Sequence, residues 1–104
     1  MTPAAIHLTL SHAVPPLGLA APVAALWWAR KDDWHKAHRL VMDEPGREAA
    51  WVHAWLQRVE GDLDNAHYWY RQARRCPADG EGDLEWNAIV AALLERGDAS
   101  RSPR

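Results

Sequence analysis

Apolar residues recur with a helical period along most of this chain. In the segment from about 47 to 60, five apolar side chains fall on one arc of a helix: Trp51, Val52, Trp55, Leu56 and Val59. The segment from about 84 to 96 carries the clearest stripe, with Trp86, Ile89, Val90, Leu93 and Leu94. Shorter stripes cover residues 20–31, 34–43 and 63–75. The pattern predicts an all-α fold of about five helices.

The sequence contains two copies of the pattern that predicts a helical hairpin. Asp33 aligns with Asp62 and Ala37 aligns with Ala66, at a constant offset of 29 residues. Sequence periods of 20 to 50 residues are typical of stacked units that bury their cores against their neighbours. We therefore expect a short stack of two helical hairpins closed by a capping helix.

Prolines and glycines set the expected limits of this domain. Pro15, Pro16 and Gly18 interrupt any helix near the amino terminus, so residues 1–18 are predicted to form an irregular arm. A single α-helical repeat domain is expected over residues 19–97. Gly97 is predicted to end the last helix and to leave residues 98–104 as a disordered tail.

Composition narrows the classes of partner. The formal net charge is −2, which argues against nucleic acid and anionic membrane as partners. Three prolines break the apolar stretch from 13 to 29, so neither a membrane span nor a signal sequence is expected. The single Cys76 cannot form an internal disulfide, which fits a reducing, cytoplasmic location. Seven Trp and no Phe predict a core filled by indoles whose N–H groups need partners.

The run from Glu60 to Ala73 resembles the second half of a tetratricopeptide or Sel1-like repeat. The matching positions are a Gly-Asp turn at Gly61-Asp62, the small residues Ala66 and Ala73, and the aromatic Tyr70. The offset of 29 residues is shorter than the usual tetratricopeptide period of about 34. The segment 25–94 also resembles a group of short bacterial proteins of uncharacterised function that share an E-G-D-x-x-N-A-x-Y-W-Y core. Both resemblances imply a helical-hairpin fold and no particular activity.

One set of polar residues suggests a metal-binding or acid/base site. His53, Gln57 and Glu60 lie at i, i+4 and i+7, so they are predicted to share one polar helix face. With His67 from the next helix, His53 and Glu60 could form a metal or acid/base cluster. The alternative is a polar network that orients neighbouring side chains. The spacing lacks an H-x-x-x-H or H-E-x-x-H motif, so no metal site, catalytic residue or cofactor is assigned.

A second set of residues suggests a binding surface. Tyr68 is predicted to point outward between Arg71 and Arg75, either as a protein contact or as a cation–π pair. Trp27 and Trp28 are about 100° apart on a helix, so one of them is expected to be interfacial, for example in a homodimer, unless the arm covers both.

The expected function is a non-catalytic protein–protein interaction module of tetratricopeptide-like type. Its partner would be a protein or peptide, or a second copy of the chain. The first alternative is a small metal-dependent or acid/base enzyme that uses His53, Glu60 and His67. The second is an accessory subunit whose partner completes the stack.

Overall fold

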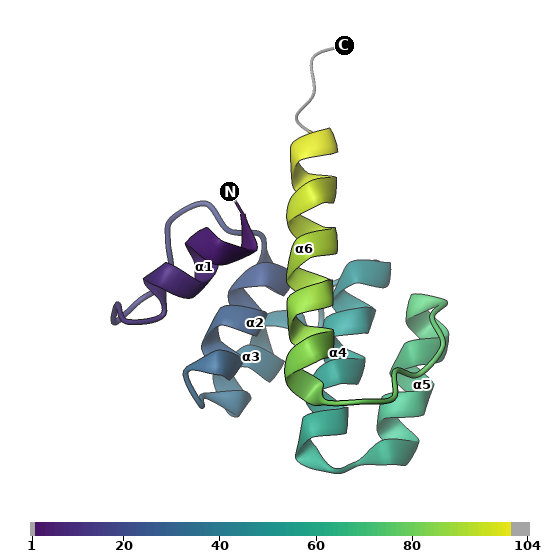
Figure 1. The fold of residues 1–104 in the computed structure, drawn as a ribbon. Helices are drawn as coiled ribbons and strands as arrows, with labels where there is room; N and C mark the ends of the chain where they lie inside the picture. Colours follow the sequence, from purple (N-terminus) through teal and green to yellow (C-terminus); the bar gives the residue numbers. More distant parts are fainter. Residues whose placement is uncertain (1, 101–104) are drawn as a thin grey trace.

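The computed structural model describes residues 2–100, with side chains through Glu95, and these residues form helices and no strand. In Figure 1 the helices are arranged as two hairpins, one short helix and one long helix. Their bounds are α1 Pro3–Thr9, α2 Ala21–Arg30, α3 Trp34–Val41, α4 Arg47–Glu60, α5 Leu63–Ala73 and α6 Gly82–Ser100. The predicted all-α class is confirmed. The described residues contain six helices where about five were expected, because α1 had been predicted as irregular chain.

Helix α4 is the centre of the packing. It pairs with α5 in one hairpin, α2 pairs with α3 in the other, and α4 also contacts α2, α3 and α6. The long helix α6 runs in front of α2 and α4 in the view of Figure 1. Every residue of α4 from 49 to 57 is buried. The prediction of a polar face on this helix is therefore wrong at His53 and Gln57, because neighbouring helices cover that side as well.

The two hairpins turn in the same way. The side chain of Asp33 caps α3 by accepting a hydrogen bond from a backbone N–H three residues on, and Asp62 caps α5 likewise. The backbone N–H of Asp33 donates to the carbonyl of Trp28 at 3.0 Å, and that of Asp62 donates to Gln57 at 3.0 Å. The donor and the acceptor of the second hydrogen bond each lie 29 residues after those of the first, which is the offset of the sequence repeat. The repeat therefore extends to the hydrogen bonds of the turn.

The amino-terminal arm contains a packed helix, which corrects the prediction for residues 1–18. Thr2 caps α1 by accepting from the N–H of Ala5, and a proline in the first turn suits the helix start. Ile6 is fully buried, and the indole N–H of Trp27 donates to Thr9 Oγ1 at 3.0 Å. Pro15 and Pro16 interrupt only the segment between α1 and α2. The packed domain therefore begins at α1 and not at residue 19.

The carboxyl-terminal limit also differs from the prediction. Helix α6 continues through Ser100, beyond Gly97. Glycine disfavours a helix interior by about 1 kcal/mol relative to alanine, but it keeps its backbone N–H and so does not interrupt the hydrogen-bond ladder. Residues 101–104 of the predicted tail lie outside the described residues.

Indole N–H groups fasten the helices to one another. Trp34 donates to the carbonyl of Leu56 at 2.8 Å, and Trp86 donates to the carbonyl of Leu26 at 2.9 Å. Trp86 is fully buried, with the His7 ring of α1 at 5.0 Å from its own. Within residues 2–100, none of the helices combines the length and the apolar character needed to cross a bilayer.

Candidate functional site

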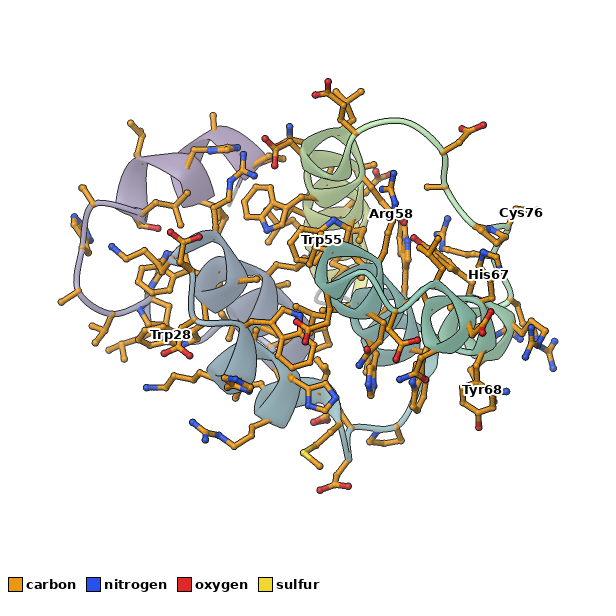
Figure 2. The ribbon with its side chains drawn as sticks, turned by 90° about the horizontal axis from the view of Figure 1, so that it is seen from below. Trp28, Trp55, Arg58, His67, Tyr68 and Cys76 are labelled. Atoms are coloured by element: carbon orange, nitrogen blue, oxygen red, sulfur yellow. The ribbon has the colours of Figure 1, made fainter. Side chains whose placement is uncertain are left out.

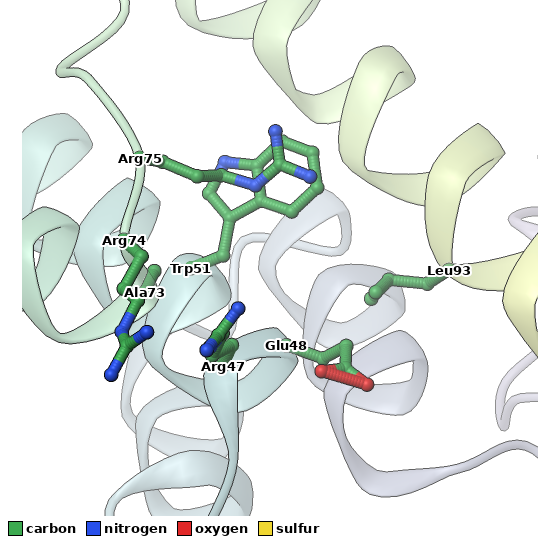
Figure 3. A pocket seen from close by; sticks show the side chains of 7 residues that line it. All are labelled: Arg47, Glu48, Trp51, Ala73, Arg74, Arg75 and Leu93. Atoms are coloured by element: carbon green, nitrogen blue, oxygen red, sulfur yellow. The ribbon is translucent and has the colours of Figure 1, made fainter.

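The main hollow of interest lies where the ends of α4 and α5 face α6. A cavity of about 320 Å³ is bordered by residues of all three helices and of the chain after α5, namely Arg47, Glu48, Trp51, Ala73, Arg74, Arg75 and Leu93 (Figure 3). A second cavity of about 500 Å³ shares Trp51, Arg74 and Arg75 with the first and continues to Ala78, Leu84 and Ala88. We call the two together the Trp51 groove.

The end of α5 decides how the arginines enter this groove. The helix stops at Ala73, and Arg74 takes a left-handed conformation with φ 57° and ψ 45°. The N–H of Arg74 donates to the carbonyl of Arg71, and the N–H of Arg75 donates to that of Tyr70, both at 3.0 Å. Such a cap satisfies the last carbonyls of a helix and redirects the chain. The two arginines therefore leave the surface of α5 and border the groove.

Arg75 stacks on the indole of Trp51, with the guanidinium carbon 3.4 Å from the ring centroid (Figure 3). The sequence had placed Arg75 beside Tyr68 on the assumption that α5 continued to that residue. That placement is wrong, because the left-handed residue at Arg74 turns the chain away from the helix face.

A buried carboxylate holds the other side of Trp51. Glu85 is 7% exposed and accepts hydrogen bonds from the hydroxyl of Tyr70 at 2.6 Å and from Arg58 Nη1 at 2.9 Å. The indole N–H of Trp51 donates to the same carboxylate at 3.3 Å. Burial and then the Glu85 carboxylate raise the pKa of the Tyr70 hydroxyl, so it stays protonated and donates. The Trp51 indole, which forms the floor of the groove, is thereby held by Arg75 on its face and by Glu85 at its N–H.

Two guanidiniums of the groove are uncommitted. Among the residues whose side chains the structure describes, those of Arg47 and Arg74 have no hydrogen-bond or ion-pair partner. Figure 3 shows both beside the open space, one from the start of α4 and one from the end of α5. Glu48 is the carboxylate that borders the same cavity, and it already has a contact of its own.

The predicted cluster of His53, Glu60 and His67 does not assemble. His53 is 5% exposed in the interior, whereas Glu60 and His67 lie on the surface. Within the described part of the chain, no group of three or more His, Cys, Asp or Glu side chains could hold a metal ion. The proposed metal or acid/base site is therefore corrected to a buried histidine.

The partner of His53 is a second histidine. Its Nε2 lies 2.9 Å from Nε2 of His38, and its ring stacks on Trp69 with centroids 3.9 Å apart. Its Nδ1 has no hydrogen-bond partner among the described residues. Burial, and next the proximity of His38, lower the pKa of His53 to about 4, so the ring is neutral at pH 7.

The predicted binding residues do not share one surface. Trp27 is fully buried against α1, so it cannot form a homodimer seam, and Trp28 is half-buried beneath Lys36. Tyr68 is 45% exposed, and its ring lies 6.0 Å from the Arg71 guanidinium. Trp28 and Tyr68 lie at opposite ends of the molecule in Figure 2. Of the five predicted residues, Arg75 is the one that borders the Trp51 groove.

The residues that sequence reasoning missed are Arg47, Trp51, Arg74 and Glu85. Trp51 had been assigned to the core, and the others carry no local motif. The one available signal was the pair Arg74-Arg75 at the end of the helix predicted over residues 63–75. In the comparisons, no family model, curated protein or solved structure matches this chain. The side chains around the groove are guanidiniums, an indole, apolar groups and the carboxylates of Glu48, Asp79 and Glu85. Arginine and tryptophan among them are suited to binding.

Proposed function

We propose that this chain is a non-catalytic protein-interaction module of tetratricopeptide-like type that binds a polypeptide in the Trp51 groove. The single observation that carries the proposal is the open groove with a rigid indole floor and arginine walls at the junction of α4, α5 and α6. The repeated turn with an offset of 29 residues supports the tetratricopeptide-like part of the proposal.

The composition of the groove favours a polypeptide over a small metabolite. Tryptophan and arginine are the residues most enriched at the energetic centres of protein interfaces. Here a Trp and an Arg are stacked, so the binding surface is ordered before a partner arrives. Preorganised side chains lose less entropy on binding. The two cavities share Trp51, Arg74 and Arg75 and are both open to the surface, so neither is an enclosed chamber for a small molecule.

Site-specific photo-crosslinking in the host cell tests this function. Leu84 is 67% exposed and borders the groove, so a photoreactive residue placed there would lie beside the partner. The control position is His35, which is exposed on α3. We expect one defined polypeptide adduct from position 84 and none from position 35. Absence of a polypeptide adduct at position 84, or equal labelling at both positions, would count against the proposal.

A substitution separates the groove from the surface around Tyr68. Tyr68→Ala removes the exposed ring from the outer side of α5, which points away from the bundle in Figure 2. If the partner binds in the Trp51 groove, the adduct from position 84 persists in this variant. Loss of the adduct would move the binding surface to Tyr68 and Arg71.

A further inference from the structure

The backbone at Arg74 is unusual for an arginine. Its φ of 57° lies in the left-handed region, where glycine or asparagine is the common residue at the end of a helix. The same conformation follows α4 at Gly61 and α2 at Asp32. The left-handed turn itself caps α5, but an arginine is less favourable than a glycine in it, so the choice of arginine calls for a reason other than folding. At Arg74 the side chain faces the groove, which points to a role for the guanidinium itself (Figure 3).

The first cavity of the groove has more guanidiniums than carboxylates along its lining. Arg47, Arg74 and Arg75 border the first cavity together with the carboxylate of Glu48. Stacking on an aromatic ring leaves the N–H groups at the edge of a guanidinium free to bind a carboxylate in its plane, so Arg75 can still contribute. Guanidiniums bind carboxylates through two parallel hydrogen bonds, which are stronger than hydrogen bonds between neutral groups.

The second half of the groove has a different chemistry. Ala78, Leu84 and Ala88 give this half an apolar part beside Trp51. The carboxylates of Asp79 and Glu85 border it as well, and that of Glu85 is already paired with Arg58. An apolar surface directly beside a cluster of guanidiniums does not suit inorganic phosphate or a nucleic-acid backbone. It suits a polypeptide segment in which acidic side chains adjoin apolar ones.

We infer that the ligand of the Trp51 groove is an acidic polypeptide segment whose carboxylates bind Arg47 and Arg74 and whose adjoining apolar side chains pack on Leu84 and Ala88. This inference rests on the proposed function and specifies the chemistry of its partner. Arg74 is then the residue that selects acidic ligands, and its left-handed backbone is the cost of placing a guanidinium at the end of α5.

A titration with model peptides tests the charge preference. The probe is acetyl-Glu-Glu-Leu-Leu-amide, followed by two-dimensional NMR of the backbone amides, the arginine side chains and the Trp51 indole. The matched controls are acetyl-Gln-Gln-Leu-Leu-amide and inorganic phosphate. We expect saturable shifts confined to the groove and an affinity at least about tenfold higher for the Glu peptide than for the Gln peptide.

A loss of binding in the variant Arg74→Gly could not be attributed to unfolding. Glycine adopts the left-handed conformation freely, so the variant should melt at an equal or higher temperature than the wild type. The same variant should lose about tenfold in affinity for the Glu peptide. The control variant is Arg39→Ala, which removes a guanidinium from α3, away from the groove. Alanine is chosen there because a glycine would destabilise the helix. This variant should bind the Glu peptide as the wild type does.

Three results would overturn the inference: equal binding of the Glu and Gln peptides, wild-type binding by Arg74→Gly, or equal groove shifts with inorganic phosphate. The last result would assign a simple anion site. A polypeptide adduct from position 84 together with any of these would leave the proposed function intact and reject only the acidic ligand. Absence of the adduct would reject the proposed function itself.

Discussion

His38 and His53 face each other across α3 and α4 with their Nε2 atoms 2.9 Å apart. One ring must donate the proton of this contact and the other must accept it, so both rings cannot be charged in this arrangement. The lowered pKa of His53 has the same origin, because a charge on its ring would be buried and would face His38.

This pair predicts a loss of stability in mild acid. The pKa of His53 is about 4 when folded and about 6.5 when unfolded, so the unfolded chain binds more protons between these values. The stabilising contribution is complete above pH 6.5 and is lost as the pH falls toward 4. We expect the free energy of unfolding to fall by about 2 kcal/mol between pH 7 and pH 5 from this group alone. Urea unfolding at a series of pH values measures it.

Two variants assign the effect to the buried ring. His53→Phe keeps an aromatic ring against Trp69 but cannot be protonated, so its free energy of unfolding should change much less between pH 7 and pH 5. His35→Phe changes an exposed histidine of α3 and should keep the wild-type slope. An unchanged slope in His53→Phe would show that other groups cause the acid sensitivity.

The Glu85 carboxylate should be among the most sensitive positions in the fold. Glu85→Ala leaves the guanidinium of Arg58, whose side chain is 16% exposed, without its carboxylate. Removing one partner of a buried ion pair costs about 3 kcal/mol or more. Tyr70→Phe removes a single hydrogen bond to Glu85 and should cost about 1 kcal/mol. Chemical denaturation of both variants measures the free energy of unfolding, and Leu84→Ala at an exposed position serves as the control. An equal loss of this free energy in Glu85→Ala and Leu84→Ala would contradict the prediction.

The repeated turn predicts opposite effects for one pair of substitutions. Asp32 has φ 64° where its repeat equivalent Gly61 has φ 95°. Asp32→Gly should therefore maintain or raise the free energy of unfolding, by up to about 1 kcal/mol. Gly61→Ala should lower it by about 1 kcal/mol through backbone strain, since no atom lies within 4 Å of the added Cβ. Thermal unfolding measures both, and a stabilising Gly61→Ala would refute the equivalence of the turns.

Helix α1 should contribute to global stability. Ile6 is fully buried, so Ile6→Ala removes packed apolar volume and should cost about 3 kcal/mol. Leu8 on the same helix is 78% exposed, and Leu8→Ala should change stability by less than about 0.5 kcal/mol. Denaturant unfolding measures both variants. If both change the free energy of unfolding only slightly, residues 3–9 do not contribute to global stability.

Local interactions were readable in the sequence. The bounds predicted for the helix at 47–60 are those of α4. The Gly-Asp turn that carries the resemblance follows this helix, and its Asp62 caps α5. Gly61 of the same turn takes the left-handed conformation that glycine adopts freely. Helical period and capping involve residues within about one turn of one another, so a single sequence carries enough information to place them.

The sequence alone thus determined an all-α chain with a repeated hairpin and most of its helix limits. Tertiary structure decided which sides of those helices are covered. His53 was assigned to a polar face, but α3 and α5 bury it, and Ile6 keeps α1 helical by packing in the core. The Trp51 groove joins residues from Arg47 to Leu93, and its form depends on a left-handed turn at Arg74. Contacts between distant segments depend on how the helices pack, and no local pattern in the sequence encodes them.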